Sequence, residues 1–92
     1  MFVAIAIHHV VPEHTDEMLA FMQRVIDRTT GSPGLIDFKA CREVDRGALA
    51  GYSRWESQAD FQAGLAAITS LRHERNPEWT VKPDEVITLE VL

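Results

Sequence analysis

Two side chains near the middle of the chain are spaced so that they can share one ligand. Ser53 and Trp55 are two residues apart in the run Gly51-Tyr52-Ser53-Arg54-Trp55-Glu56. Side chains alternate along a strand, so both would point to the same face. There Trp55 could stack on a flat aromatic molecule while Ser53 forms a hydrogen bond to it. The alternative for Trp55 is a core position at the end of the strand, with one partner for its indole N–H.

Three histidines are candidates for acid–base chemistry, because imidazole titrates near neutral pH. His73 lies in the charged run Arg72-His73-Glu74-Arg75, where it could act as a base or an axial ligand, or be a solvated surface residue. His8 and His9 are neighbours on a predicted strand and must face opposite ways. The face that carries His9 is the bulkier one, with Val3, Ile5 and Ile7. We therefore expect His9 to face the helices and a cavity.

Other kinds of chemistry find no support in the residue pattern. Ser53 has no histidine and carboxylate nearby in sequence to make it a nucleophile. The sequence contains no phosphate-binding glycine loop and no metal-ligand spacing, so we expect no metal. Cys41 is the only cysteine, which fits a reducing cytoplasm, and we expect its side chain to be buried or half-buried.

The charge pattern and the first residues exclude two further classes of partner. The chain has 9 basic and 14 acidic residues and a net charge of −5, and the basic residues are scattered. This argues against nucleic acid. The apolar segment at residues 1–11 lacks a basic leader and is too short to cross a bilayer, so we expect no membrane association.

The elements that position these residues follow from hydrophobic spacing and turn residues. Runs rich in Val, Ile and Leu predict strands at residues 2–10, 35–44, 49–56 and 85–92. Apolar residues three and four apart predict a helix at about 15–29 and a second from Ser57 to about 69, and a short helical piece interrupted near Pro77 is expected at about 71–79. Ser57 and Asp60 form a capping pair at the start of the second helix.

This order of elements predicts an α+β, ferredoxin-like fold (β-α-β-β-α-β) with an antiparallel four-stranded sheet and its helices on one face. A chain of 92 residues is expected to form a single domain over residues 1–92. The first strand is apolar on both sides. We therefore expect a second copy to cover the open face, giving a homodimer through the sheet faces, a dimeric α/β barrel.

The sequence resembles the antibiotic biosynthesis monooxygenase family of dimeric α+β barrel proteins over nearly its whole length. The resemblance is carried by the apolar first strand, by Gly31-Ser32-Pro33-Gly34 before Leu35-Ile36-Asp37-Phe38, and above all by Tyr52-Ser53-Arg54-Trp55-Glu56-Ser57 with Asp60-Phe61. Together with the residue pattern, it implies a mostly apolar cavity between helices and sheet. The catalytic candidates are Trp55, His73 and His9, and the substrate-binding candidates are Ser53, Gly51 and Phe61.

The family includes cofactor-free oxygenases of polyketide anthrones, haem-degrading enzymes and members of unknown activity. The resemblance implies a monooxygenase-like protein that acts on a small aromatic phenol, anthrone or quinol without cofactor. The oxygenase branch has an asparagine where this chain has Gly51. One alternative is a haem-binding or haem-oxidising protein, whose branch has a histidine near His73 but a tryptophan near Gly64. The other alternative is a non-catalytic small-ligand-binding module.

Overall fold

The computed structural model describes all residues 1–92, and its elements follow the predicted order. The strands are β1 (Phe2–His8), β2 (Leu35–Arg42), β3 (Leu49–Trp55) and β4 (Glu85–Glu90). The helices are α1 (Thr15–Thr29) and α2 (Gln58–Thr69). Short 3-10 turns occupy Pro12–His14, Arg72–Glu74 and Pro77–Trp79, the last two where a short helical piece interrupted near Pro77 is predicted.

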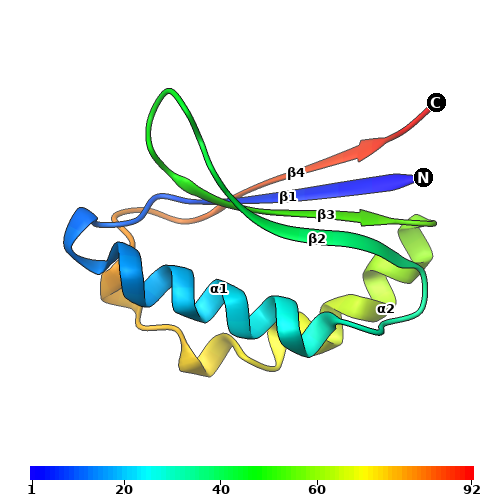
Figure 1. Cartoon of the computed structure of the whole chain (residues 1–92), viewed down its shortest axis with the longest axis horizontal. Coiled ribbons are helices and arrows are strands. Elements are labelled where there is room, and N and C mark those ends of the chain that lie inside the picture. Colours follow the sequence, from blue (N-terminus) through cyan, green and yellow to red (C-terminus); the bar gives the residue numbers. More distant parts are fainter.

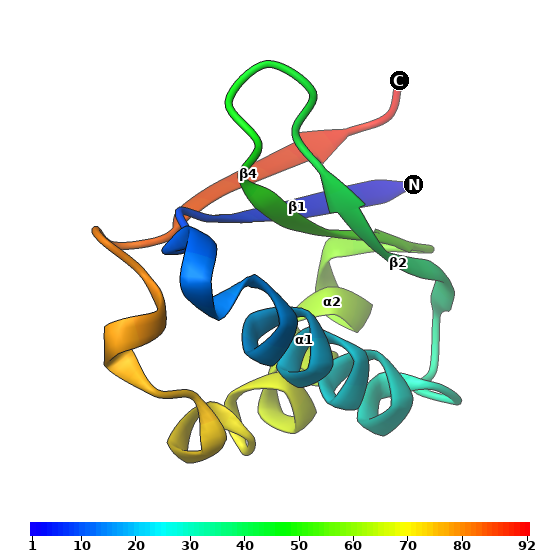
Figure 2. The same cartoon turned by 60° about the vertical axis from the view of Figure 1, so that its left-hand side comes forward.

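The four strands form one antiparallel sheet in the order β2-β3-β1-β4. Phe2 pairs with Trp55 on one side and with Glu90 on the other, so the two ends of the chain lie side by side (Figure 1). Both helices cover one face of the sheet, and the loop between β2 and β3 rises on the opposite side (Figure 2). This arrangement confirms the predicted ferredoxin-like fold.

Local signals set several of the element boundaries. The Ser57 hydroxyl accepts a hydrogen bond from the Asp60 N–H at 3.1 Å, and α2 begins at the next residue, as expected of an N-cap. Gly47 has a φ of +75° in the turn between β2 and β3. β1 ends at His8, earlier than predicted, because β4 begins opposite Ile7 and Val10 forms only an isolated bridge to Thr80.

The core lies between the sheet and the two helices. α1 contributes Met18, Phe21, Met22 and Val25, which pack against Leu49 and Leu71. A second cluster at the other end of the sheet contains Phe2, Ala4 and Trp55, with Phe61 of α2 packed against it. Neither helix combines the length and hydrophobicity that a membrane span requires.

The sheet face away from the helices remains largely uncovered. Ile87 and Leu89 of β4 are 42% and 50% exposed, and Ile7 packs there against Ala48 and Ala50. Cys41 is exposed, so the prediction of a buried or half-buried position is wrong. The reason is that β2 is an edge strand, and Cys41 pairs with Ala50 on the face that no helix covers.

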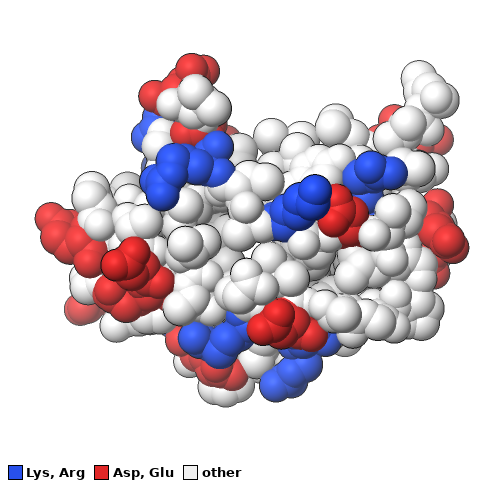
Figure 3. Space-filling model, in the orientation of Figure 1, with Lys and Arg blue, Asp and Glu red and all other residues white.

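The side of the molecule seen in Figure 3 carries charges in small, separated groups of both signs. Broad areas without charged atoms lie between them. Lys and Arg side chains do not merge into one continuous patch on this side. This distribution lacks the concentrated positive surface that binds a phosphate backbone.

Candidate functional site

A cavity of about 230 Å³ lies between the sheet and the helices. An engineered cavity of ~150 Å³ holds benzene, so this space suits a molecule of one or two rings. Most of its wall is hydrophobic, and the polar groups gather at one end. The apolar wall includes Ala4, Ala6, Phe21, Met22, Val25, Phe38, Phe61, Leu65, Ile68 and Val86, and the polar end consists of His8, Arg72, Arg75 and Asp84.

The cavity exists because the central strands present small residues to the helices. Ala4 and Ala6 of β1 and Gly51 of β3 line it. A Cβ atom at Gly51 would make only an ordinary contact, at 3.5 Å, with the ring of Phe38. The helices bring the large side chains, such as Phe21, and a central strand with equally large ones would fill the space between the layers.

This layer packing overturns the prediction for His9. The bulky face of β1 (Val3, Ile5, Ile7 and His9) lies on the side away from the helices, and the smaller face lies beneath them. His8 therefore lines the cavity, and His9 does not. The expectation that the bulkier face packs under the helices was wrong because the helices themselves supply the bulk.

The three substrate-binding candidates, Gly51, Ser53 and Phe61, all line the cavity. Ser53 is 4% exposed. Its hydroxyl accepts a hydrogen bond from the indole N–H of Trp55 at 2.9 Å and donates to the carbonyl of Ala4 at 3.4 Å. A hydroxyl has one donor and two acceptor positions, so one acceptor position of Ser53 remains for a ligand.

Trp55 takes the core position that was the alternative to ligand stacking. Its side chain is fully buried, and the ring of Phe61 meets it edge-on with centroids 5.9 Å apart. Gly64 of α2 lies against the six-membered part of the indole. Trp55 is not part of the cavity wall, and its indole N–H is already satisfied by Ser53. The residue shapes the site by supporting Ser53 and α2.

His73 is exposed in the 3-10 turn Arg72–Glu74 and does not line the cavity. The neighbours Arg72 and Arg75 do. A 3-10 turn has three residues per turn, so residues 72 and 75 lie on one side while 73 points elsewhere. The structure thus does not bring His73 together with the other candidates.

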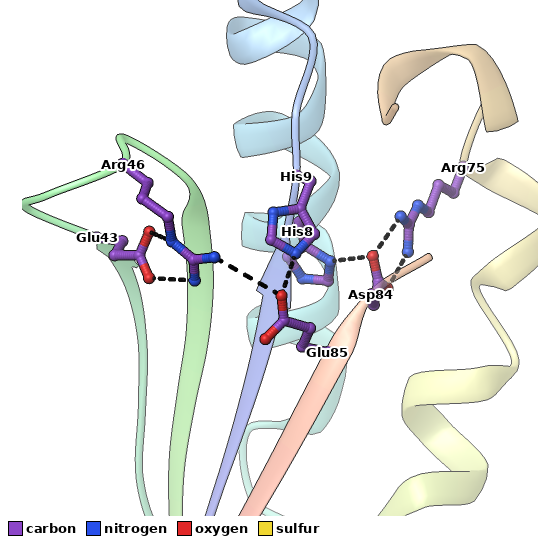
Figure 4. Close-up of polar contacts among 7 residues, drawn as sticks. All are labelled: His8, His9, Glu43, Arg46, Arg75, Asp84 and Glu85. Carbon is purple, nitrogen blue, oxygen red and sulfur yellow. Dashed lines mark hydrogen bonds and ion pairs between the residues drawn. The ribbon is translucent and has the colours of Figure 1, made fainter. Parts of the chain in front are cut away.

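The polar end of the cavity is built around Asp84, the residue immediately before β4 (Figure 4). Its two oxygens accept hydrogen bonds from the guanidinium of Arg75 at 2.5 and 2.7 Å. The Nδ1 atom of His8 lies 3.1 Å from Asp84 Oδ1. Burial by itself would raise the pKa of Asp84, but the hydrogen bonds from Arg75 and the nearby His8 outweigh it and hold that pKa well below the ordinary value.

This arrangement defines which atom of His8 is basic. The Nδ1 atom of His8 is buried and forms no well-aligned hydrogen bond, but the ionised Asp84 3.1 Å away favours the tautomer with the proton on Nδ1, so the Nε2 atom of the neutral imidazole keeps its lone pair. A carboxylate beside a histidine also stabilises the imidazolium that forms when Nε2 takes up a proton. The polar end can therefore act as a general base next to an apolar chamber.

The sequence offered a signal for this group that was not used. His8 and His9 are adjacent near the end of the first strand, and Asp84 and Glu85 are adjacent near the start of the last one. Antiparallel pairing of these strands, with Ile7 opposite Glu85, brings the two pairs together. Pairing the chain's first and last strands would have matched each histidine with its carboxylate.

His9 belongs to a separate polar group on the other side of the sheet (Figure 4). Its Nε2 atom lies 2.7 Å from Glu85 Oε1, and Arg46 of the β2–β3 loop lies 3.9 Å from the same oxygen. Arg46 also donates two hydrogen bonds to Glu43, which lower the pKa of that carboxyl group. In neither polar group do three or more His, Cys, Asp or Glu side chains come together in a way that could hold a metal ion.

The chain is similar to one known protein family over most of its length. The protein-family profile described as antibiotic biosynthesis monooxygenase matches residues 1–67. A search of curated protein sequences found no significant match.

Solved structures resemble the whole chain at low sequence identity. A putative antibiotic biosynthesis monooxygenase from Nitrosomonas europaea is 18% identical, with a TM-score of 0.85 over 100% of this chain and 99% of that one. A Mycobacterium tuberculosis protein is 19% identical, with a TM-score of 0.85 over 99% and 94%. The heme degrader MhuD from the same organism, solved with two hemes bound in its active site, is 22% identical, with a TM-score of 0.80 over 100% and 96%.

Proposed function

Because the chain belongs to the antibiotic biosynthesis monooxygenase family, we propose that it oxygenates a small aromatic phenol, anthrone or quinol without metal, flavin or other cofactor. The observation that carries this proposal is the mostly apolar cavity of about 230 Å³ with His8 and Asp84 at its polar end. Its volume suits one or two rings, so a phenol or quinol fits the cavity as it stands, whereas a three-ring anthrone requires the cavity to widen. Its polar end supplies the one group such chemistry needs, a base beside an apolar chamber.

The proposed chemistry draws its electrons from the substrate. Nε2 of His8 removes a proton from an activated C–H or O–H group, and the resulting carbanion or phenolate reduces dioxygen. For an anthrone, the CH₂ group becomes a carbonyl, one oxygen atom stays in the product, and the other leaves as water. The CH₂ group loses four electrons and dioxygen gains four, so no external reductant is required. The protein contributes the base, the orientation and an apolar environment.

The side chains around the cavity have distinct roles in this proposal. His8 is the base, and Asp84 is a positioning residue that fixes the tautomer of His8. Ser53 offers an acceptor position to a substrate hydroxyl, and Phe61 provides a wall for the ring. Gly51 contributes space in place of the asparagine side chain of the oxygenase branch, so orientation falls to His8 and Ser53.

Oxygen uptake tests the proposal directly. We would measure it for metal-free protein with a panel of anthrones and hydroquinones, beside His8→Gln and the matched control His9→Gln. We expect His8→Gln to lower the protein-dependent rate by about 10²–10⁴-fold, the usual contribution of a general base, and His9→Gln to leave it unchanged. A rate with wild-type protein no higher than in buffer would contradict the proposal and favour a non-catalytic binding module.

Haem, which MhuD binds, is the second ligand to consider because of the shared fold. A porphyrin contains four pyrrole rings and exceeds a cavity that suits one or two. His73 lies outside the cavity and is not placed to be an axial ligand there. The site as it stands does not fit haem. A haemin titration checks this, since a shifted Soret band at one equivalent, absent in His8→Gln, would show that the cavity opens to admit it.

The uncovered face of the sheet supports a homodimer as part of the proposal. Ile87, Leu89 and Val91 are 42%, 50% and 51% exposed, and exposed apolar residues on a two-sided apolar sheet are typical of an interface. A second copy related by a two-fold axis would bury them. Light scattering should give about twice the chain mass of 10.4 kDa for the wild type. Ile87→Asp places a charge in the proposed interface and should give a monomer. The single cysteine also agrees with a reducing cytoplasm as the proposed location.

A further inference from the structure

The polar end of the cavity contains an arginine that no acidic group neutralises. Arg72 and Arg75 both line the cavity. Arg75 is held by both oxygens of Asp84, whereas the Arg72 guanidinium forms no ion pair and no side-chain hydrogen bond. Arg72 is exposed, so its guanidinium lies where the cavity reaches the surface.

We propose that the ligand of this cavity carries a carboxylate and that Arg72 binds it, so that the natural substrate is a hydroxylated aromatic acid of one or two rings. The inference deepens the proposed function of the cavity and rests on it. The carboxylate reaches Arg72 and an adjacent hydroxyl group lies toward His8, both at the polar end of the cavity, and the ring extends along the apolar wall.

The balance of charge supports an anionic ligand. Arg75 and Asp84 cancel each other, so the positive charge of Arg72 is left without a counter-charge in the cavity wall. The chain as a whole has a net charge of −5. The positive charge at the mouth of this mostly apolar chamber is therefore opposite in sign to the net charge of the protein, and it attracts an anion into the cavity.

The kind of anion follows from the donors available. A single guanidinium presents a planar pair of N–H groups that matches a carboxylate. The cavity wall also includes Thr69, the last residue of α2, where the negative end of the helix dipole opposes any anion and opposes a doubly charged one more strongly. A phosphate would bring that second charge and would find no further free cation. The site thus favours a monoanion.

The test compares two probes that differ only in charge. We would measure the binding of 3-hydroxy-2-naphthoate, whose hydroxyl and carboxylate are adjacent, and of its neutral amide, 3-hydroxy-2-naphthamide, by titration calorimetry without oxygen. The variants are Arg72→Met, which keeps much of the aliphatic stem, and Arg28→Met as control. Arg28 is also exposed and without an ion pair, but it lies on α1 outside the cavity.

We expect the wild-type protein to bind the naphthoate about five- to tenfold more tightly than the amide, as for a partly solvated ion pair. Arg72→Met should remove this preference without changing the affinity for the amide, and Arg28→Met should preserve it. Added salt should reduce the preference.

Equal binding of the two probes by wild-type protein, or a preference that survives in Arg72→Met, would overturn the inference. Binding of neither probe would overturn it together with the cavity as a ligand site. Selective binding without oxygen uptake in air would support the inference while contradicting the oxygenase proposal, so the two failures are distinguishable.

Discussion

Gly64→Ala should destabilise the protein, although the same change usually stabilises a helix. Gly64 lies in the interior of α2, where alanine is favoured over glycine by about 1 kcal/mol. An added Cβ atom, however, would lie 2.4 Å from the Cη2 atom of Trp55 and 2.8 Å from its Cζ3 atom. The Trp55 ring is fully buried and cannot move aside freely.

The size of the effect follows from the overlap. Ordinary contacts of a Cβ atom begin at 3.4 Å, so the ring or the helix must shift by 1.0 Å. Overpacking of this kind costs about 1–3 kcal/mol, and an immobile ring places the cost near the upper limit. After the helix propensity is subtracted, Gly64→Ala should lower the free energy of unfolding by about 2 kcal/mol. For a chain of this length, the melting temperature should fall by about 8–16 °C.

A double-mutant cycle in urea at fixed protein concentration isolates the contact. Trp55→Phe removes the outer ring atoms that Gly64 faces, so Gly64→Ala in that background should stabilise by about 0.5–1 kcal/mol. Ala63→Gly, at an exposed neighbouring position of α2, measures the propensity alone and should cost about 1 kcal/mol. If Gly64→Ala proved as stable as the wild type while Ala63→Gly behaved as expected, the close packing of α2 on Trp55 would be refuted.

Three further predictions concern the polar groups and the open face. Asp84→Asn should lower the free energy of unfolding at pH 7 by about 1–2 kcal/mol, because Arg75 and His8 lose a charged partner. Because the pKa of Asp84 is lowered in the folded protein, the ionised carboxyl group contributes its full stabilisation above the ordinary pKa of 3.8, and this stabilisation is lost as the pH falls further. The free energies of unfolding of wild type and variant, measured in urea, should therefore converge in acid, and a difference that stays constant with pH would contradict this. His8→Gln should remove the protein-dependent oxygen uptake while His9→Gln retains it, and equal losses would place the base elsewhere. Ile87→Asp should give a species of 10.4 kDa in light scattering with native circular dichroism, and an unchanged dimer would exclude β4 from the interface.

The elements and their caps were predictable because their signals are local. Thr15 and Thr29 bound α1 as the apolar spacing predicts, and Ser57 caps α2 through the neighbouring Asp60. The order of these elements predicted the ferredoxin-like fold, and the resemblance to the family added the region of the cavity. It pointed to Ser53, Gly51 and Phe61, and all three line the cavity.

The remaining site residues depend on contacts between distant parts of the chain. Whether His8 or His9 faces the cavity depends on which side of the sheet the helices cover, and the size of the strand residues gave the wrong answer. Asp84 meets His8 only through the pairing of β4 with β1. Trp55 is buried rather than open to a ligand because Gly64, nine positions further on, allows α2 to lie directly against it. None of these outcomes follows from a short window of sequence.

The position of β1 in the sheet has a consequence for how the protein is made. Of the four strands of the sheet, β1 leaves the ribosome before the others, yet both of its neighbours, β3 and β4, are synthesised long after it. Until then its two apolar faces and its unpaired backbone edges remain open to wrong partners. Pairing strands so far apart in sequence also closes long loops, which slows folding. We therefore expect nascent chains that end before residue 85 to be the most aggregation-prone species of this protein and the ones most in need of chaperones.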